Sequence, residues 1–231
     1  MNPALKTSFA LALAVVVAAS VEAQVVTYEN LGSTALGGYS EPATSSPIFG
    51  DALNMTQGGK LSSVGFSLFN STSGGNTGSI LAGTMVIKFY DNSANYVSGP
   101  LSSLPLLGTA TLNLDYSGDP LPPGFYLTDS ADISGLNINV PQNIFVTQQF
   151  TMTSGTSTRN GIILFSNPTV GSSPANVYIS SATTPEGLYT FSGNPNQFGY
   201  HIEVTVVPEP STLALAALGG VGIVALRRRR D

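Results

Sequence analysis

Hydrophobic and polar positions alternate with a period of two along much of the chain. In the segment TMVIKFYD, the side chains of Met85, Ile87 and Phe89 are expected on one face and the residues between them on the other. In TATLNLDY, Ala110 and Leu112 begin a second apolar face of the same kind. Such alternation predicts β-strands with one buried and one exposed face.

The pattern predicts about ten strands between residues 24 and 207. The expected strands begin near residues 25, 61, 84, 109, 136, 143, 161, 176, 187 and 199. Turn clusters rich in Gly, Pro, Asn and Asp separate them, and no helical period interrupts them. We therefore predict an all-β fold for residues 24–207, a single antiparallel β-sandwich of jelly-roll type. Two smaller domains also fit this length.

The N-terminus has the pattern of an export signal rather than of a core element. Lys6 precedes an apolar run over residues 9–19, and small or short residues follow up to Ala23. This order predicts a signal peptide at 1–23, read by the Sec export machinery and cleaved between Ala23 and Gln24. The alternative is a buried N-terminal helix.

The C-terminus combines a short apolar run with a cluster of positive charge. Residues 213–226 carry no charge, and a helix of that length reaches about 21 Å, against about 30 Å for a hydrocarbon core. With two more residues, 211–226 is a marginal transmembrane helix. Positive charge beside an apolar segment stays on the cytoplasmic side, so the domain before it is expected outside. The cluster consists of Arg227, Arg228, Arg229 and Arg230.

Residues 208–231 resemble the PEP-CTERM protein-sorting signal of bacterial surface proteins. The resemblance rests on Pro208, Glu209 and Pro210, the apolar helix with its glycines, and the arginine cluster. It implies recognition by an exosortase, a membrane-embedded processing enzyme, which removes the helix and arginines near Pro-Glu-Pro. It also implies a final location at the cell surface or in the extracellular matrix of bacteria that make exopolysaccharide. A permanent membrane anchor is the alternative.

Composition excludes several classes of function. The whole chain is 9% charged and contains no Cys, no Trp and one His. Residues 24–207 carry three basic against ten acidic residues, a net charge of −7, which disfavours nucleic acid as a partner. A Ser or Thr nucleophile would have only His201 as its base, and one His without Cys cannot complete a zinc site. We expect His201 on the solvent face of a strand, and no enzymatic activity.

The sequence indicates no cofactor, and calcium is the one metal for which its loops offer ligands. Carboxylates occur in the turn-like segments DNSAN, DYSGD and DSAD. Oxygen ligands from such loops suit Ca²⁺, although none of the segments has the EF-hand spacing. The candidate ligands are Asp91, Asp115, Asp119, Asp129 and Asp132. The Asp pairs within DYSGD and DSAD also suggest glycosidase carboxylates, but turns enrich Asp for local hydrogen bonds.

Two functions fit these observations. The first is a non-enzymatic surface or biofilm-matrix protein with a structural or adhesive role. The second is a module that binds glycan or exopolysaccharide, for which aromatic side chains would provide stacking surfaces. The candidate tyrosines are Tyr39, Tyr96, Tyr126, Tyr178 and Tyr189, each of which could equally pack at the edge of the core.

Overall fold

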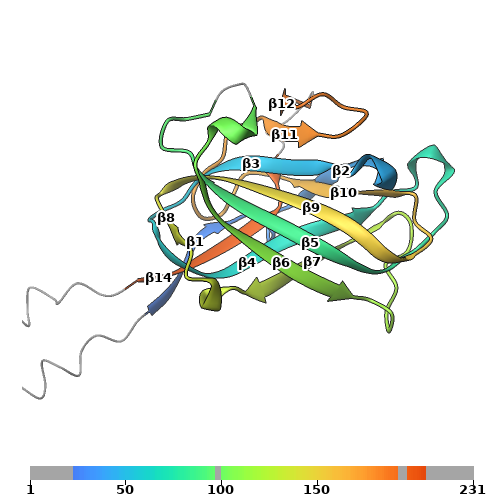
Figure 1. Cartoon of the computed structure of the whole chain (residues 1–231), viewed down its shortest axis with the longest axis horizontal. Helices are drawn as coiled ribbons and strands as arrows, with labels where there is room; N and C mark the ends of the chain where they lie inside the picture. Colours follow the sequence, from blue (N-terminus) through green and yellow to red (C-terminus); the bar gives the residue numbers. More distant parts are fainter. Residues whose placement is uncertain (1–22, 97–99, 192–196, 207–231) are drawn as a thin grey trace, which may run out of the picture. The chain divides into compact units, whose positions relative to one another are not determined.

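A computed structural model describes residues 23–96, 100–191 and 197–206, and these residues form two antiparallel β-sheets (Figure 1). Both sheets belong to the compact unit Val25–Val204, apart from the outermost residues of β1 and β14. The strands are β1 (Ala23–Glu29), β2 (Ala35–Pro42), β3 (Ile48–Asn54), β4 (Gly59–Asn70), β5 (Ile80–Asp91), β6 (Leu106–Asp115), β7 (Phe125–Asp132), β8 (Asn139–Val140), β9 (Asn143–Gly155), β10 (Arg159–Phe165), β11 (Val177–Ser180), β12 (Gly187–Tyr189), β13 (Gln197–Phe198) and β14 (Tyr200–Val206).

One sheet contains six strands in the order β12-β11-β3-β9-β5-β6. Its longest pairing joins β5 to β9 from Ile80↔Gly155 to Asp91↔Ile144. β6 pairs with β5 and ends the sheet, and three-residue β12 ends it on the other side. Strands far apart in sequence are therefore neighbours, which is typical of sandwiches with long connections.

The second sheet contains eight strands, with the path β1-β14-β4-β10-β13. β7 and β8 also pair with β4, and β2 pairs with β10. The signal peptide predicted at 1–23 lies outside the described residues except for Ala23, where β1 begins. β1 is adjacent in this sheet to β14, the last strand before residue 207.

The core lies between the two sheets and has the side chains that alternation predicts. Met85, Ile87 and Phe89 of β5 are fully buried, as are Phe66 and Leu68 of β4. On β6, exposed threonines alternate with buried or half-buried residues, so the expected faces are confirmed for both segments.

A smaller apolar cluster covers the outer face of the six-stranded sheet. Tyr90, Phe145 and Tyr178 form its centre, together with Leu101 from the loop that connects β5 to β6. The short 3-10 turn Leu101–Ser103 brings that leucine to the sheet. This loop is packed against the sheet by its own apolar side chains, as in compact Ω-loops.

Several strands differ from the expected ones. β2, β3 and β7 lie where no strand was predicted, and the strand expected from residue 136 is only Asn139–Val140, preceded by the 3-10 turn Ser134–Leu136. Polar residues interrupt the apolar alternation that would predict these strands. β7 is an exposed edge strand, and β3 contains a buried aspartate. The all-β class and the two antiparallel sheets are confirmed. The jelly-roll connectivity stays a prediction, and the helix predicted at 211–226 lies outside the described residues.

Candidate functional site

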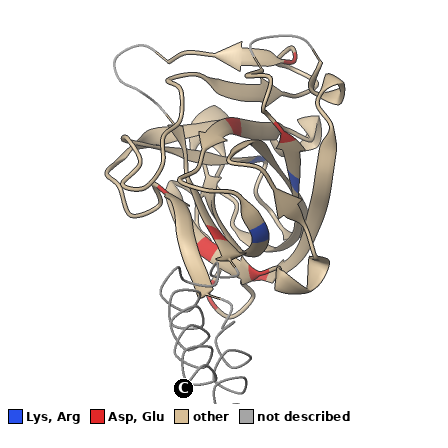
Figure 2. Cartoon of the chain, turned by 90° about the vertical axis from the view of Figure 1, so that its left-hand side faces the viewer, with Lys and Arg blue, Asp and Glu red and all other residues tan. Residues whose placement is uncertain are grey.

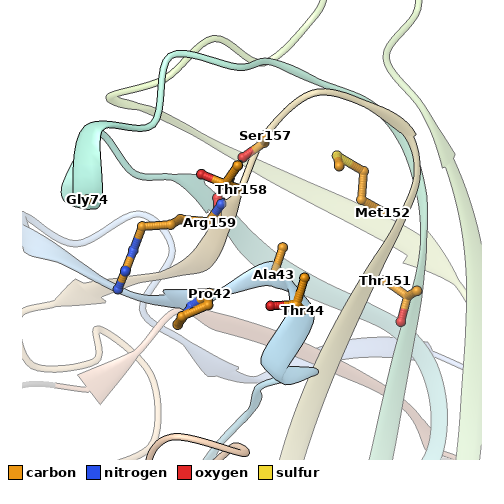
Figure 3. Close-up of a pocket in the computed structure, with 9 residues that line it drawn as sticks. All are labelled: Pro42, Ala43, Thr44, Gly74, Thr151, Met152, Ser157, Thr158 and Arg159. Carbon is orange, nitrogen blue, oxygen red and sulfur yellow. Dashed lines mark hydrogen bonds between the residues drawn. The ribbon is translucent and has the colours of Figure 1, made fainter.

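A groove opens where three loops meet at one end of the strands; we call it the loop groove (Figure 3). Its volume is about 580 Å³. Its lining comes from the end of β2 and the turn after it, the β4–β5 loop, β9, and the β9–β10 loop with the start of β10. The lining residues are Pro42, Ala43, Thr44, Gly74, Thr151, Met152, Ser157, Thr158 and Arg159. Most of this lining is apolar, its polar groups are hydroxyls and the Arg159 guanidinium, and no carboxylate side chain lines it.

A buried amide network holds two of these loops in place. Asn76 is 5% exposed and its Nδ2 donates to Asn70 Oδ1 at 2.8 Å and to the Ser71 carbonyl at 2.7 Å. Its Oδ1 accepts the backbone N–H groups of Gly78 and Thr158, each at 3.1 Å. Because Thr158 lines the loop groove, this network fixes the groove's shape.

Arg159 and Glu41 lie on neighbouring strands beside the loop groove. The Arg159 Nη2 donates to the Ser40 carbonyl at 2.9 Å, and in the described part of the chain no carboxylate oxygen lies within 4.0 Å of the guanidinium. Burial alone would raise the pKa of Glu41, but hydroxyl groups of Thr184, Tyr39 and Thr183 hydrogen-bond the carboxylate and its pKa lies below the usual value. Glu41 therefore ties β2 to the loop between β11 and β12.

A second groove lies on the outer face of the eight-stranded sheet; we call it the sheet groove. Its volume is about 440 Å³. The lining residues are Glu29, Leu31, Gly32, Thr128, Asp129, Ser130 and His201. Glycine is required at position 65 beneath the groove, since a Cβ there would lie 2.8 Å from both His201 Cβ and Leu31 Cδ1. None of the lining residues is Lys or Arg, so the groove suits neutral or cationic groups.

His201 is held between two carboxylates in the sheet groove. Its Nδ1 hydrogen-bonds Glu29 Oε2, and its Nε2 lies 3.1 Å from Glu203 Oε1. Tyr200, Ile202 and Val204 are buried behind it, so the predicted alternation of β14 is confirmed, although His201 itself is half-buried. Because both ring nitrogens already face carboxylate oxygens, neither is directed at a nearby Ser or Thr as a base.

The five predicted calcium ligands lie at the ends of β5 and β6, in the turn after β6, and along β7. Asp91, Asp115 and Asp132 each accept the backbone N–H of the serine two residues later. Hydrogen bonds from these serines place the pKa of each of the three carboxyls below its usual value. Within 23–96, 100–191 and 197–206, no three His, Asp or Glu side chains gather as a metal-binding group. Calcium binding stays a prediction.

The candidate tyrosines divide into packed and exposed ones. Tyr178 donates to Glu186 Oε1 at 2.7 Å, Tyr39 to Glu41 Oε1 at 2.5 Å and Tyr189 to the Pro185 carbonyl at 2.6 Å. Tyr96 packs against Phe145 with ring centroids 5.2 Å apart. Tyr126 is 45% exposed and shares the outer face of β7 with Thr128 of the sheet groove.

The buried carboxylate of Asp51 is a feature that the sequence analysis missed. It lies between the sheets with no exposed surface, and accepts Ser173 Oγ–H at 2.8 Å and the Phe198 N–H at 3.1 Å. Burial raises its pKa well above the usual value. Burial, and then the Asp51 charge, raises the pKa of Tyr200. The only sequence signal is one Asp in the short apolar segment IFGDAL.

The described residues therefore define an all-β protein of two antiparallel sheets, with sparse charge (Figure 2). Residues 206–230 match the family model of the PEP-CTERM protein-sorting motif, so the chain carries this motif at its C-terminus. The motif implies an exported protein that is sorted by an exosortase. Within the described ranges, no helix is long and apolar enough to span a bilayer. Pro208, Glu209, Pro210 and the arginine cluster lie outside those ranges.

No curated protein matches the chain. Solved structures of infectious bursal disease virus do match, with TM-scores near 0.2. The Gx strain structure has a TM-score of 0.21 and 8% identity over 92% of this chain and 48% of the other. The VP2 subviral particle has a TM-score of 0.22 and 12% identity over 92% and 47%. The chain thus spans about half the length of these structures.

Proposed function

We propose that this protein is a non-enzymatic component of the bacterial surface or extracellular matrix with a structural or adhesive role. The observation that carries the proposal is the sorting motif at 206–230, which begins at the last residue of β14. The all-β domain is thus joined to its sorting signal without an intervening segment. Exosortase is expected to remove the helix and arginines, so that membrane attachment is transient.

The side chains of the domain support a non-enzymatic role. The chain has no cysteine, and its single histidine is engaged by Glu29 and Glu203. Asp115 and Asp132, two of the glycosidase candidates, accept hydrogen bonds from backbone N–H groups within their own turns. The buried amide of Asn76 is hydrogen-bonded at both its nitrogen and its oxygen, which is a feature of a stable scaffold.

Variants of the sorting motif are expected to change location without changing the fold. A proline disfavours helix at the residue before it, so we expect Glu209 in an extended segment that a processing enzyme can bind, and Glu209→Ala should remain unprocessed in the membrane fraction. Deleting residues 227–230 removes the charge that retains the tail, so this variant should be released with its apolar segment intact. Intact mass and cell fractionation in the native host measure both outcomes.

Asp119→Ala is the matched control, because it removes one acidic side chain from an exposed turn of the domain. It should be processed and sorted like the wild type. Far-UV circular dichroism checks that all variants fold. Wild-type mass and location in both motif variants would contradict the roles assigned to Glu209 and the arginines.

Glycan binding is a second candidate function, and the sheet groove favours it. Tyr126 offers an exposed ring on the strand that supplies Thr128 and Ser130, and hydroxyl and carboxylate groups beside it suit sugar hydroxyls. Under this function the full chain in detergent should bind neutral oligosaccharides on an array. Tyr126→Ala should weaken binding by about tenfold or less, since an aromatic contact contributes about 0.5–1.5 kcal/mol.

Phe125→Ala is the matched control, because Phe125 is also exposed but its side chain points to the other face of β7. Its affinity should equal that of the wild type. No binding to any neutral glycan, or equal losses in both variants, would remove this candidate.

A further inference from the structure

Strand β6 has one edge that no described strand covers. It lies at the end of the six-stranded sheet, and its register pairs it only with β5, from Leu106↔Tyr90 to Asp115↔Ala82. The backbone N–H and C=O groups that point away from β5 therefore form a template for another strand.

β6 carries one of the devices that commonly block such an edge, a bulge at Leu107, but residues 108–114 lack the others. Residues 106–114 read LLGTATLNL, with no charged residue and no proline. Thr109, Thr111 and Asn113 are exposed on the outer face, and Leu106 is 56% exposed. Other edge strands differ: β12 and β13 are only three and two residues long, and β7 carries Asp129 and Asp132. β2 carries Glu41 and Pro42. On β1, the Thr27 carbonyl accepts the Thr56 N–H and the Glu29 N–H donates to the Val170 carbonyl. Short length and charge are both known protections of an edge.

We propose that β6 pairs antiparallel with β6 of a second copy of this chain, which joins two six-stranded sheets into one. The inference goes beyond the structural role proposed above, and holds whether or not the tail is processed. Because two domains of net charge −7 repel each other, contact between copies is least unfavourable along a stretch without charge, and residues 106–114 form such a stretch.

The proposed pairing is self-complementary about a two-fold axis at Thr111. Thr111 then faces its own copy, and Thr109 faces Asn113 of the other chain. Asp115 faces the bulge at Leu107, so no carboxylate lies directly opposite another. Polar cross-strand pairs of this kind stabilise antiparallel sheets, and a two-fold interface closes as a dimer.

A single introduced cysteine tests the pairing, because the chain contains none. Directly opposite residues in an antiparallel pair have Cβ atoms about 4.5–5.5 Å apart, close enough for a disulfide after small adjustments. Full-length Thr111→Cys in detergent should form a disulfide-linked dimer under mild oxidation. Thr128→Cys, an exposed threonine on the edge strand β7, is the control and should stay monomeric. Equal rates of cross-linking in the two variants would overturn the proposal.

A non-covalent measurement complements the cross-link. Light scattering on the full chain should show a dimer that Thr111→Lys dissociates, because two lysines would face each other at the axis. The side chain of Thr111 points to solvent, so the domain should keep its fold, which circular dichroism monitors. A dimer that survives Thr111→Lys, or a wild-type chain that stays monomeric at its highest soluble concentration, would contradict β6 pairing.

Discussion

Replacing Asn76 with alanine is expected to destabilise the domain by about 3 kcal/mol. Its amide donates to Asn70 and Ser71 and accepts from Gly78 and Thr158, and alanine leaves these buried groups without partners. Each buried group left unsatisfied costs about 1–3 kcal/mol, partly offset where water enters. Urea denaturation of the wild type and the variant measures the difference.

Asn139→Ala is the matched control, since Asn139 is exposed on the short strand β8. Its effect should stay within about 0.5 kcal/mol, as is usual for surface positions. A loss below 1 kcal/mol for Asn76→Ala would mean that the loops around the loop groove do not depend on this network.

Asp51→Asn is expected to make stability less sensitive to pH above about pH 4. Burial raises the pKa of Asp51 in the folded domain, so its contribution to stability is fully present below the unfolded pKa of about 3.9. As pH rises toward the folded pKa, that contribution is lost, by up to about 1.4 kcal/mol per pH unit. Asparagine has no proton to lose, and its amide can donate to Ser173 and accept from Phe198 after rotation.

The free energy of unfolding of Asp51→Asn relative to the wild type should therefore grow between pH 4 and pH 7. Asp115→Asn provides a control of opposite sign, because hydrogen bonds to Ser117 lower the pKa of Asp115. Its relative stability should fall only as pH rises toward the unfolded pKa of about 3.9, and should stay nearly level above about pH 5. Parallel pH profiles for Asp51→Asn and the wild type would show that Asp51 does not hold its proton through folding.

The parts of the fold that the sequence predicted are those governed by local pattern. Met85 to Phe89 on β5 and Tyr200 to Val204 on β14 alternate because each strand has one buried face. β3 was not predicted because its buried face includes Asp51. The hydrogen bonds that this carboxyl accepts come from Ser173 and Phe198, which are far along the chain. An isolated aspartate gives no sign of such distant partners.

Among the candidate sites, too, only the one with a local pattern could be predicted from the sequence. The sorting motif is a continuous segment, so the sequence alone identified it and the family model confirmed it. The loop groove brings together Ala43, Gly74 and Thr158 from three loops, and the sheet groove joins Glu29, Ser130 and His201. Long-range strand pairing creates both grooves, and no local pattern specifies which strands become neighbours.

The most direct test of export and sorting is the intact mass of the native protein from membrane and extracellular fractions of its host, with the C-terminal peptide identified. We predict a chain that begins at Gln24 and lacks everything beyond the Pro-Glu-Pro region, found outside the membrane. A mass that retains Arg227 to Arg230, found only in membranes, would contradict processing and would make the domain a permanently anchored protein.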